Sequence, residues 1–163
     1  MEYHIQDVCE ADLEQVLRLN QSEVPQVGSV DLDRIRWFSE HAAYFRVAKS
    51  GDELGAYLIG LRPGTAYASP NYRWFCRRFV DFAYVDRVAV AETARRQRLA
   101  SRLYEDFAAT VIDSVDVMTC EVNLRPPNES SMQFHLRQGF VQAGTLESDD
   151  GTKEVAMLVK RLR

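Results

Sequence analysis

The chain is poor in the residues that mark unusual protein classes. Its 163 residues include only three cysteines, five prolines and eight glycines. So little proline and glycine excludes collagen-like and low-complexity chains, and three widely spaced cysteines do not make a disulfide framework. We expect reduced thiols, as in a cytosolic protein. The length suits one core, so we predict a single domain over residues 1–163.

Long apolar runs and an excess of positive charge are also missing. No stretch approaches the ~18 apolar residues of a membrane-spanning helix, and no basic segment followed by an apolar one opens the chain. We therefore expect a cytoplasmic protein that neither spans nor binds a membrane. The net charge of -4 offers no broad attraction for nucleic acid, which would need a local basic patch.

Several common site motifs are absent as well. The sequence contains no P-loop, no G-x-G-x-x-G, no G-x-S-x-G, no H-E-x-x-H and no paired C-x-x-C, and we predict no metal site. Cys120 and His135 could form a thiol nucleophile and its base. A lone cysteine in an apolar strand is, however, more often a packing residue.

Apolar periodicity predicts alternating strands and helices. Arg62 to Asp81 forms a long aromatic and basic segment, which we interpret as a lid or groove wall. The order β-α-α-β-β-β-α-β-α-β-β predicts an α/β fold with a mixed sheet and helices on both faces. The predicted strands cover residues 3–8, 43–48, 54–61, 82–90, 115–122, 140–146 and 154–162, and the helices begin near Asp12, Asp31, Thr93 and Asn128. Asp31 and Asn128 can cap their helices, Gly139 stands where a left-handed residue would end the last helix, and Gly151 lies in a predicted hairpin turn.

Arginines gather where the strand 82–90 runs into the following helix. Arg95, Arg96 and Arg98 stand at the predicted start of this helix, where unpaired N–H groups and the helix dipole attract anions. Such a junction suits a pyrophosphate. From charge alone, a solvated basic face on an amphipathic helix explains the arginines equally well.

This stretch resembles motif A of the GNAT superfamily of acyl-CoA-dependent N-acetyltransferases, [QR]-x-x-G-x-[GA] after a V-x-V strand. Arg95 and Ala100 match the motif, but Arg98 stands where the family usually has glycine. Residues 128–140 resemble a later family pattern, N-x-x-[SA]-x-x-[FL]-Y-x-x-x-G-F, with His135 in place of the tyrosine. The chain is similar to small bacterial GNAT proteins without an established substrate, and the resemblance implies the GNAT fold with splayed central strands.

The resemblance also implies where acetyl-CoA binds. The main chain of the strand would hold the pantetheine arm, the amides of the following turn would hold the pyrophosphate, and two residues of the later pattern would help to fix the arm. These cofactor-binding residues are Val88, Ala89, Val90, Arg95, Arg96, Gln97, Arg98, Leu99, Ala100, Ser101, Asn128 and Ser131.

The catalytic candidates are Asp86, Glu121 and His135. An amine must be neutral to attack a thioester, so Asp86 or Glu121 would accept its proton, directly or through water. His135 would protonate the leaving thiolate, because an ordinary pKa near 6.5 makes the imidazolium accessible. Structural roles stay open: Asp86 pairing with Arg87 or Arg73, Glu121 anchoring a loop, and His135 as a core residue.

The predicted function is transfer of an acetyl or short acyl group from acetyl-CoA to a primary amine in a ternary complex. The acceptor is a small molecule or a protein amine, and the protein is a monomer or homodimer. One alternative is a non-catalytic acyl-CoA-binding or regulatory module on the same fold. Another, a nucleic-acid-binding domain that uses the arginines, conflicts with the net charge.

Overall fold

The computed structural model describes residues 1–163 and confirms the predicted fold class. Seven strands form one mixed sheet in the order β1-β2-β3-β4-β5-β7-β6, accompanied by five α-helices. The elements are β1 (His4–Asp7), α1 (Leu13–Ser22), α2 (Leu32–His41), β2 (Tyr44–Ser50), β3 (Glu53–Leu61), α3 (Pro70–Cys76), β4 (Ala83–Val90), α4 (Leu99–Val111), β5 (Val117–Arg125), α5 (Glu129–Arg137), β6 (Val141–Glu147) and β7 (Glu154–Arg161).

The helix ends follow local sequence signals, with one exception. The carboxylate of Asp31 accepts a hydrogen bond of 2.8 Å from Arg34 N, and Asn128 Oδ1 caps α5 at Ser131 N. Gly139 adopts the expected left-handed conformation after α5, with φ at +95°. Asp12 directly precedes α1 as predicted, but its side chain does not cap that helix and instead accepts hydrogen bonds from Cys9 N and Lys49 Nζ.

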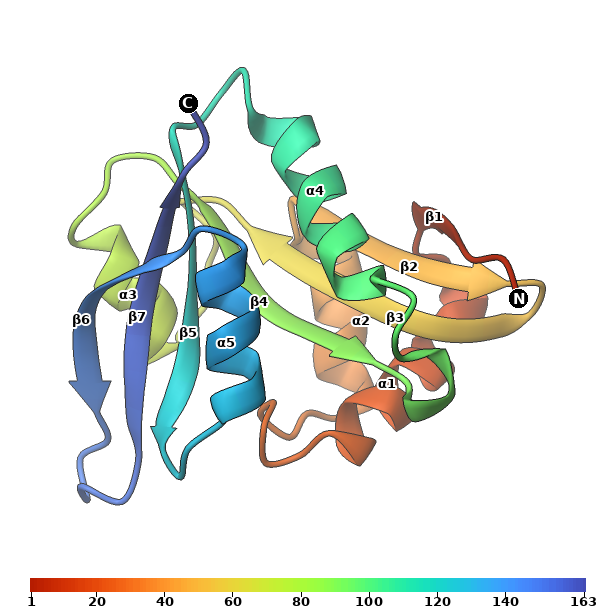
Figure 1. Ribbon diagram of the computed structural model, residues 1–163, viewed down its shortest axis with the longest axis horizontal. Coiled ribbons are helices and arrows are strands. Elements are labelled where there is room, and N and C mark those ends of the chain that lie inside the picture. Colours follow the sequence, from red (N-terminus) through yellow and green to blue (C-terminus); the bar gives the residue numbers. More distant parts are fainter. The chain divides into compact units, whose positions relative to one another are not determined.

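The chain divides into two compact units, and each unit consists of two separate segments of the sequence. The first comprises residues 1–61 and 85–110. Here α4 packs on one face of β2 and β3, where Phe107 stacks on Tyr44 with ring centroids 4.7 Å apart (Figure 1). Helix α1 covers the other face, where Asn20 accepts a 2.6 Å hydrogen bond from the Tyr57 hydroxyl.

The second unit comprises residues 62–84 and 111–163, and it contains an element that periodicity did not predict. Part of the expected lid is α3, whose aromatic residues Tyr72, Trp74 and Phe75 are buried. Trp74 packs so closely on β6 that a side chain at Gly144 would meet its ring at 2.7 Å. The helical part of this segment is therefore a packed part of the core.

Strand β4 pairs with β5 in parallel at its start, where the register joins Ala83 to Met118 and Tyr84 to Thr119. Further along, the side chains of Asp86 and Arg87 are 4% and 8% exposed, while both residues as a whole are intermediate. The exposed area at these positions therefore belongs mainly to the main chain. Such a backbone can pair with an extended ligand.

Candidate functional site

A 3₁₀ turn at Glu92–Ala94 follows β4, and a non-helical loop then precedes α4, so the α-helix begins later than the sequence predicted. Arg95, Arg96, Gln97 and Arg98 are exposed, and α4 begins only at Leu99. Arg96 and Arg98 have φ values of 67° and 57°. An α-helix of L-residues cannot continue through these left-handed conformations, so the arginines form a loop that leads into the helix.

Arg98 has a left-handed backbone conformation, which glycine adopts more easily than any other residue. Its side chain is 74% exposed and approaches Glu105 of α4 at 3.5 Å. The side chain therefore leads away along the helix instead of filling the loop. The departure from the family pattern costs backbone strain and leaves the main chain of the loop accessible.

The main chain of this loop suits a phosphate group. Left-handed residues in a turn direct successive N–H groups toward a common concave side, which binds anions. The first turn of α4 adds amides that have no partner within the helix. The Arg95 guanidinium lies 3.4 Å from Glu23. Loop conformation, helix start and arginine content together fit the pyrophosphate of coenzyme A.

The strain at position 98 predicts an unusual stability order. Arg98→Gly is expected to be about 1 kcal/mol more stable than Arg98→Ala, because only glycine adopts a positive φ without cost. Urea denaturation measures the difference. Ala109, exposed on α4, is the control: there alanine should be more stable than glycine by about 1 kcal/mol. A preference for alanine at both positions would contradict the left-handed conformation.

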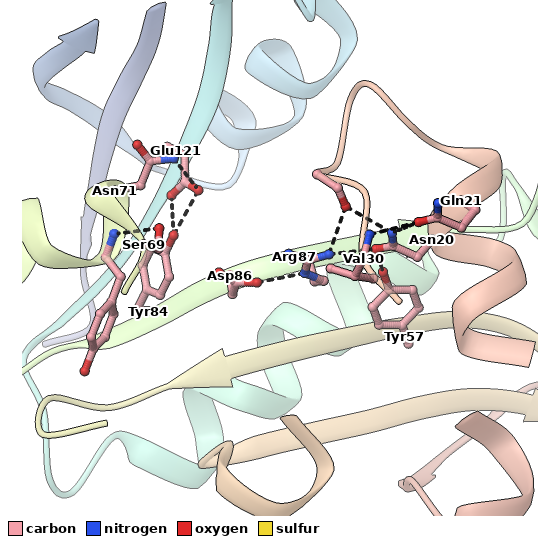
Figure 2. Close-up of polar contacts among 12 residues, drawn as sticks. Asn20, Gln21, Val30, Tyr57, Ser69, Asn71, Tyr84, Asp86, Arg87 and Glu121 are labelled. Carbon is pink, nitrogen blue, oxygen red and sulfur yellow. Dashed lines mark hydrogen bonds and ion pairs between the residues drawn. The ribbon is translucent and has the colours of Figure 1, made fainter. Parts of the chain in front are cut away.

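Asp86 lies in a buried ion pair. Arg87 Nε contacts Asp86 Oδ2 at 2.7 Å, and both side chains are almost fully buried. Arg87 Nη1 also donates to Asn20 Oδ1 at 3.0 Å and to the Gly28 carbonyl at 3.1 Å (Figure 2). One guanidinium thus ties β4 to α1 and to the segment between α1 and α2. Of the roles left open for Asp86, the structure shows the pairing with Arg87.

Asn20 is a buried polar residue near Asp86 and Arg87 that the sequence reasoning missed. It is fully buried on the apolar face of α1, and its amide donates to Gly28 O and Gln21 Oε1 while its oxygen accepts from Tyr57 and Arg87. The available signal was its position four residues after Val16, which places Asn20 on the apolar face of the helix. A buried amide there needs hydrogen-bond partners from neighbouring elements.

Glu121 on β5 is the second carboxylate candidate. Its two oxygens lie 2.9 and 2.8 Å from the Tyr84 hydroxyl, and Asn71 Nδ2 donates to Oε1 at 3.1 Å. The residue is half-buried, so it keeps access to solvent. Figure 2 shows the Tyr84 phenol and the Asn71 amide directed at this carboxylate. Sequence reasoning identified Glu121 but neither of its partners.

His135 is buried in the second unit. Burial lowers its pKa below 6.5, which disfavours the imidazolium at neutral pH. Its Nδ1 lies 2.7 Å from the Ser131 carbonyl, which can only accept, so Nδ1 carries the proton. In the neutral ring Nε2 is then unprotonated and can accept a hydrogen bond. Burial therefore argues against the predicted role of His135 as a proton donor.

The predicted residues fall into two groups. Asp86, Val88 to Val90 and Arg95 to Ser101 belong to the first unit, and Glu121, Asn128, Ser131 and His135 belong to the second. Within the second unit the helix α5 brings Ser131 and His135 into contact, with Oγ 3.3 Å from Nδ1. The Asn128 side chain is used to cap that helix.

The seven-stranded mixed sheet with its five α-helices defines an α/β protein, and an arginine-rich loop leads from β4 into α4. The model of the acetyltransferase (GNAT) family matches residues 11–140. The chain therefore belongs to the GNAT N-acetyltransferase family. This confirms the resemblance on which the sequence prediction relied.

Solved structures share the fold at low identity. The protein smu.2055 from Streptococcus mutans UA159 is 20% identical with a TM-score of 0.77, over 98% of this chain and 99% of that one. Ard1 from Thermoplasma volcanium is 18% identical with a TM-score of 0.79, over 99% and 98%. The ribosomal-protein-S18-alanine N-acetyltransferase from Escherichia coli is 14% identical with a TM-score of 0.73, over 98% and 94%. Such identities show the fold alone.

A comparison with curated proteins finds no match. None of the helices has the length and apolar character needed to cross a membrane.

Proposed function

We propose that this protein transfers an acetyl or short acyl group from acyl-CoA to a primary amine by direct attack in a ternary complex. The observation that carries the proposal is the loop from Arg95 to Arg98, in which two arginines take left-handed conformations before α4. Family membership supplies acyl-CoA as the donor. Each compact unit consists of two segments that are separated in the sequence by a segment of the other unit. Because neither unit is one continuous stretch of chain, this supports one domain over residues 1–163.

The proposed cofactor site uses main-chain groups. The main chain of Val88, Ala89 and Val90 would pair with the pantetheine arm, and the amides from Arg96 to Ser101 would hold the pyrophosphate. Asn128 and Ser131 would contribute from the start of α5. Because backbone groups make most of these contacts, the side chain at position 98 does not decide binding.

The proposed reaction needs one proton acceptor near the amine. The amine nitrogen forms a bond to the acyl carbon, the bond from that carbon to sulfur breaks, and the thiolate leaves with the electron pair. Glu121 is the proposed base, because it is half-buried and its hydrogen-bond partners are neutral donors. The Asp86 side chain is instead engaged by the Arg87 guanidinium and is almost fully buried, so it has little access to an amine.

His135 takes a different role from that of an acid. Its neutral ring has Nε2 as an acceptor, so it would orient a donor or water in the site, and the thiolate would receive its proton from the amine or from water. His135 stands at a position where the family has tyrosine. This difference favours a second candidate function, an acyl-CoA-binding module without transferase activity.

Ligand-induced stabilisation and turnover separate these functions. At a free concentration 100 times Kd, CoA is expected to stabilise the fold by about 2.7 kcal/mol, seen as a higher melting temperature. ATP, which has adenine and phosphates but no pantetheine, is the control and should stabilise less. Thiol release from acetyl-CoA across a panel of amines then measures transfer.

Each result has a definite meaning. Stabilisation with amine-dependent thiol release supports the transferase. Stabilisation without release for any amine favours the binding module. A melting temperature that millimolar CoA leaves unchanged contradicts both functions.

A further inference from the structure

The carboxylate of Glu121 is held by two donors from different elements. Tyr84 of β4 presents its hydroxyl to both oxygens at 2.9 and 2.8 Å, and Asn71 of α3 donates to Oε1 at 3.1 Å. The Asn71 amide has N–H groups to give, and a phenol of ordinary pKa is protonated at neutral pH. Both neighbours therefore match an ionised carboxylate, which only accepts.

Both donors are fixed by their surroundings. The Tyr84 ring is fully buried, with the rings of Tyr72 and Phe75 at centroid distances of 5.5 and 5.7 Å. Its backbone is paired with Thr119 of β5. Asn71 sits in the first turn of α3, which the Ser69 side chain caps. Neither side chain has to change its position when a substrate binds. A base whose hydrogen-bond donors are already in place is preorganised.

We infer that Tyr84 and Asn71 are positioning residues that hold the Glu121 carboxylate in place and ionised, so that it accepts the proton of the attacking amine. This inference rests on the proposed function. Among the contacts of Glu121 are the Tyr84 phenol of β4 and the Asn71 amide of α3, and Met157 of β7 lies opposite it in the register. Hydrogen bonds that neutral donors give to a carboxylate favour its charged form.

The first test is a direct titration of Glu121. Carbon-13 NMR of the glutamate carboxyl groups, with the Glu121 signal assigned through Glu121→Gln, should show its midpoint moving up by roughly one pH unit or more in Tyr84→Phe. Asn71→Ala should move it in the same direction. Tyr72→Phe is the matched control: Tyr72 belongs to the same aromatic cluster, but its hydroxyl donates to Arg62 O. It should leave the midpoint unchanged.

The second test is the pH profile of transfer. In Tyr84→Phe, the pH at which kcat/KM falls on the acid side should rise by the same amount as the midpoint of the Glu121 titration. At pH values below this midpoint kcat/KM should be about tenfold lower than in the unmodified protein. At pH values well above it, kcat/KM should be unchanged. A purely structural role would lower activity at every pH. In the Glu121→Gln background, Tyr84→Phe should have no further effect.

Contrary results are distinct from a failure of the proposed function. An unshifted Glu121 titration in both Tyr84→Phe and Asn71→Ala overturns the inference whatever the activity. An equal loss from Tyr84→Phe with and without the Glu121 carboxylate also overturns it. The absence of transfer to any amine, with CoA bound, overturns the proposed function and with it the proton-accepting role, while the titration still decides whether the two donors hold the carboxylate.

Discussion

Replacing Arg87 by methionine is expected to destabilise the protein by about 3–5 kcal/mol. The change leaves the Asp86 carboxylate buried without its ion-pair partner, and removing one member of a buried pair costs this much. It also removes donors from the oxygen of Asn20 and from the Gly28 carbonyl. The segment between α1 and α2 then loses its link to β4.

Urea denaturation measures this loss, and two comparisons show its origin. Arg36→Met breaks an exposed pair with Glu10 and should change stability little. Adding Asp86→Asn to Arg87→Met should recover part of the loss, because the uncompensated charge is removed. A small effect of Arg87→Met, or a double variant that loses the full sum of the single changes, would contradict the ion pair as the source.

Glu121→Gln is expected to lower kcat for amine transfer by roughly 10²- to 10⁴-fold, the usual contribution of a general base. Glutamine has the same shape but cannot take a proton, so CoA-induced stabilisation should persist. Steady-state thiol release with a saturating amine gives kcat, and the melting temperature with and without CoA reports folding and binding.

Matched variants decide whether Glu121 is the base. Glu14→Gln, on the exposed side of α1, should leave kcat unchanged. Asp86→Asn should act mainly on stability, since its carboxylate is in the pair with Arg87. If Asp86→Asn abolishes turnover in a stable protein while Glu121→Gln keeps it, the roles of the two carboxylates are exchanged.

Local sequence signals predicted most of the elements. Asp31 and Asn128 cap their helices as expected, and Gly139 and Gly151 have positive φ where a helix end and a hairpin turn require it. These signals act over three or four residues, so no distant part of the chain has to be known. The family patterns at Arg95 to Ala100 and Asn128 to Phe140 likewise identified the fold.

Three features lay beyond such signals. Helix α3 is short and owes its position to burial of Tyr72, Trp74 and Phe75, which periodicity over seven residues does not reveal. The left-handed Arg98 contradicts residue preference and follows from the path between β4 and α4. The pKa of His135 depends on burial, which removes water from the imidazolium.

Sequence alone determined the class of this protein and the segment proposed to hold a phosphate group. The reason is that helix caps, the alternation of apolar and polar residues and the family motifs each depend on residues close together in the chain. The tertiary structure decided the state of the catalytic candidates. Asp86 became an ion-pair partner, His135 a neutral ring and Glu121 a carboxylate held by Tyr84 and Asn71. The physical reason is that charge and protonation depend on solvent access and on donors brought together from distant parts of the chain.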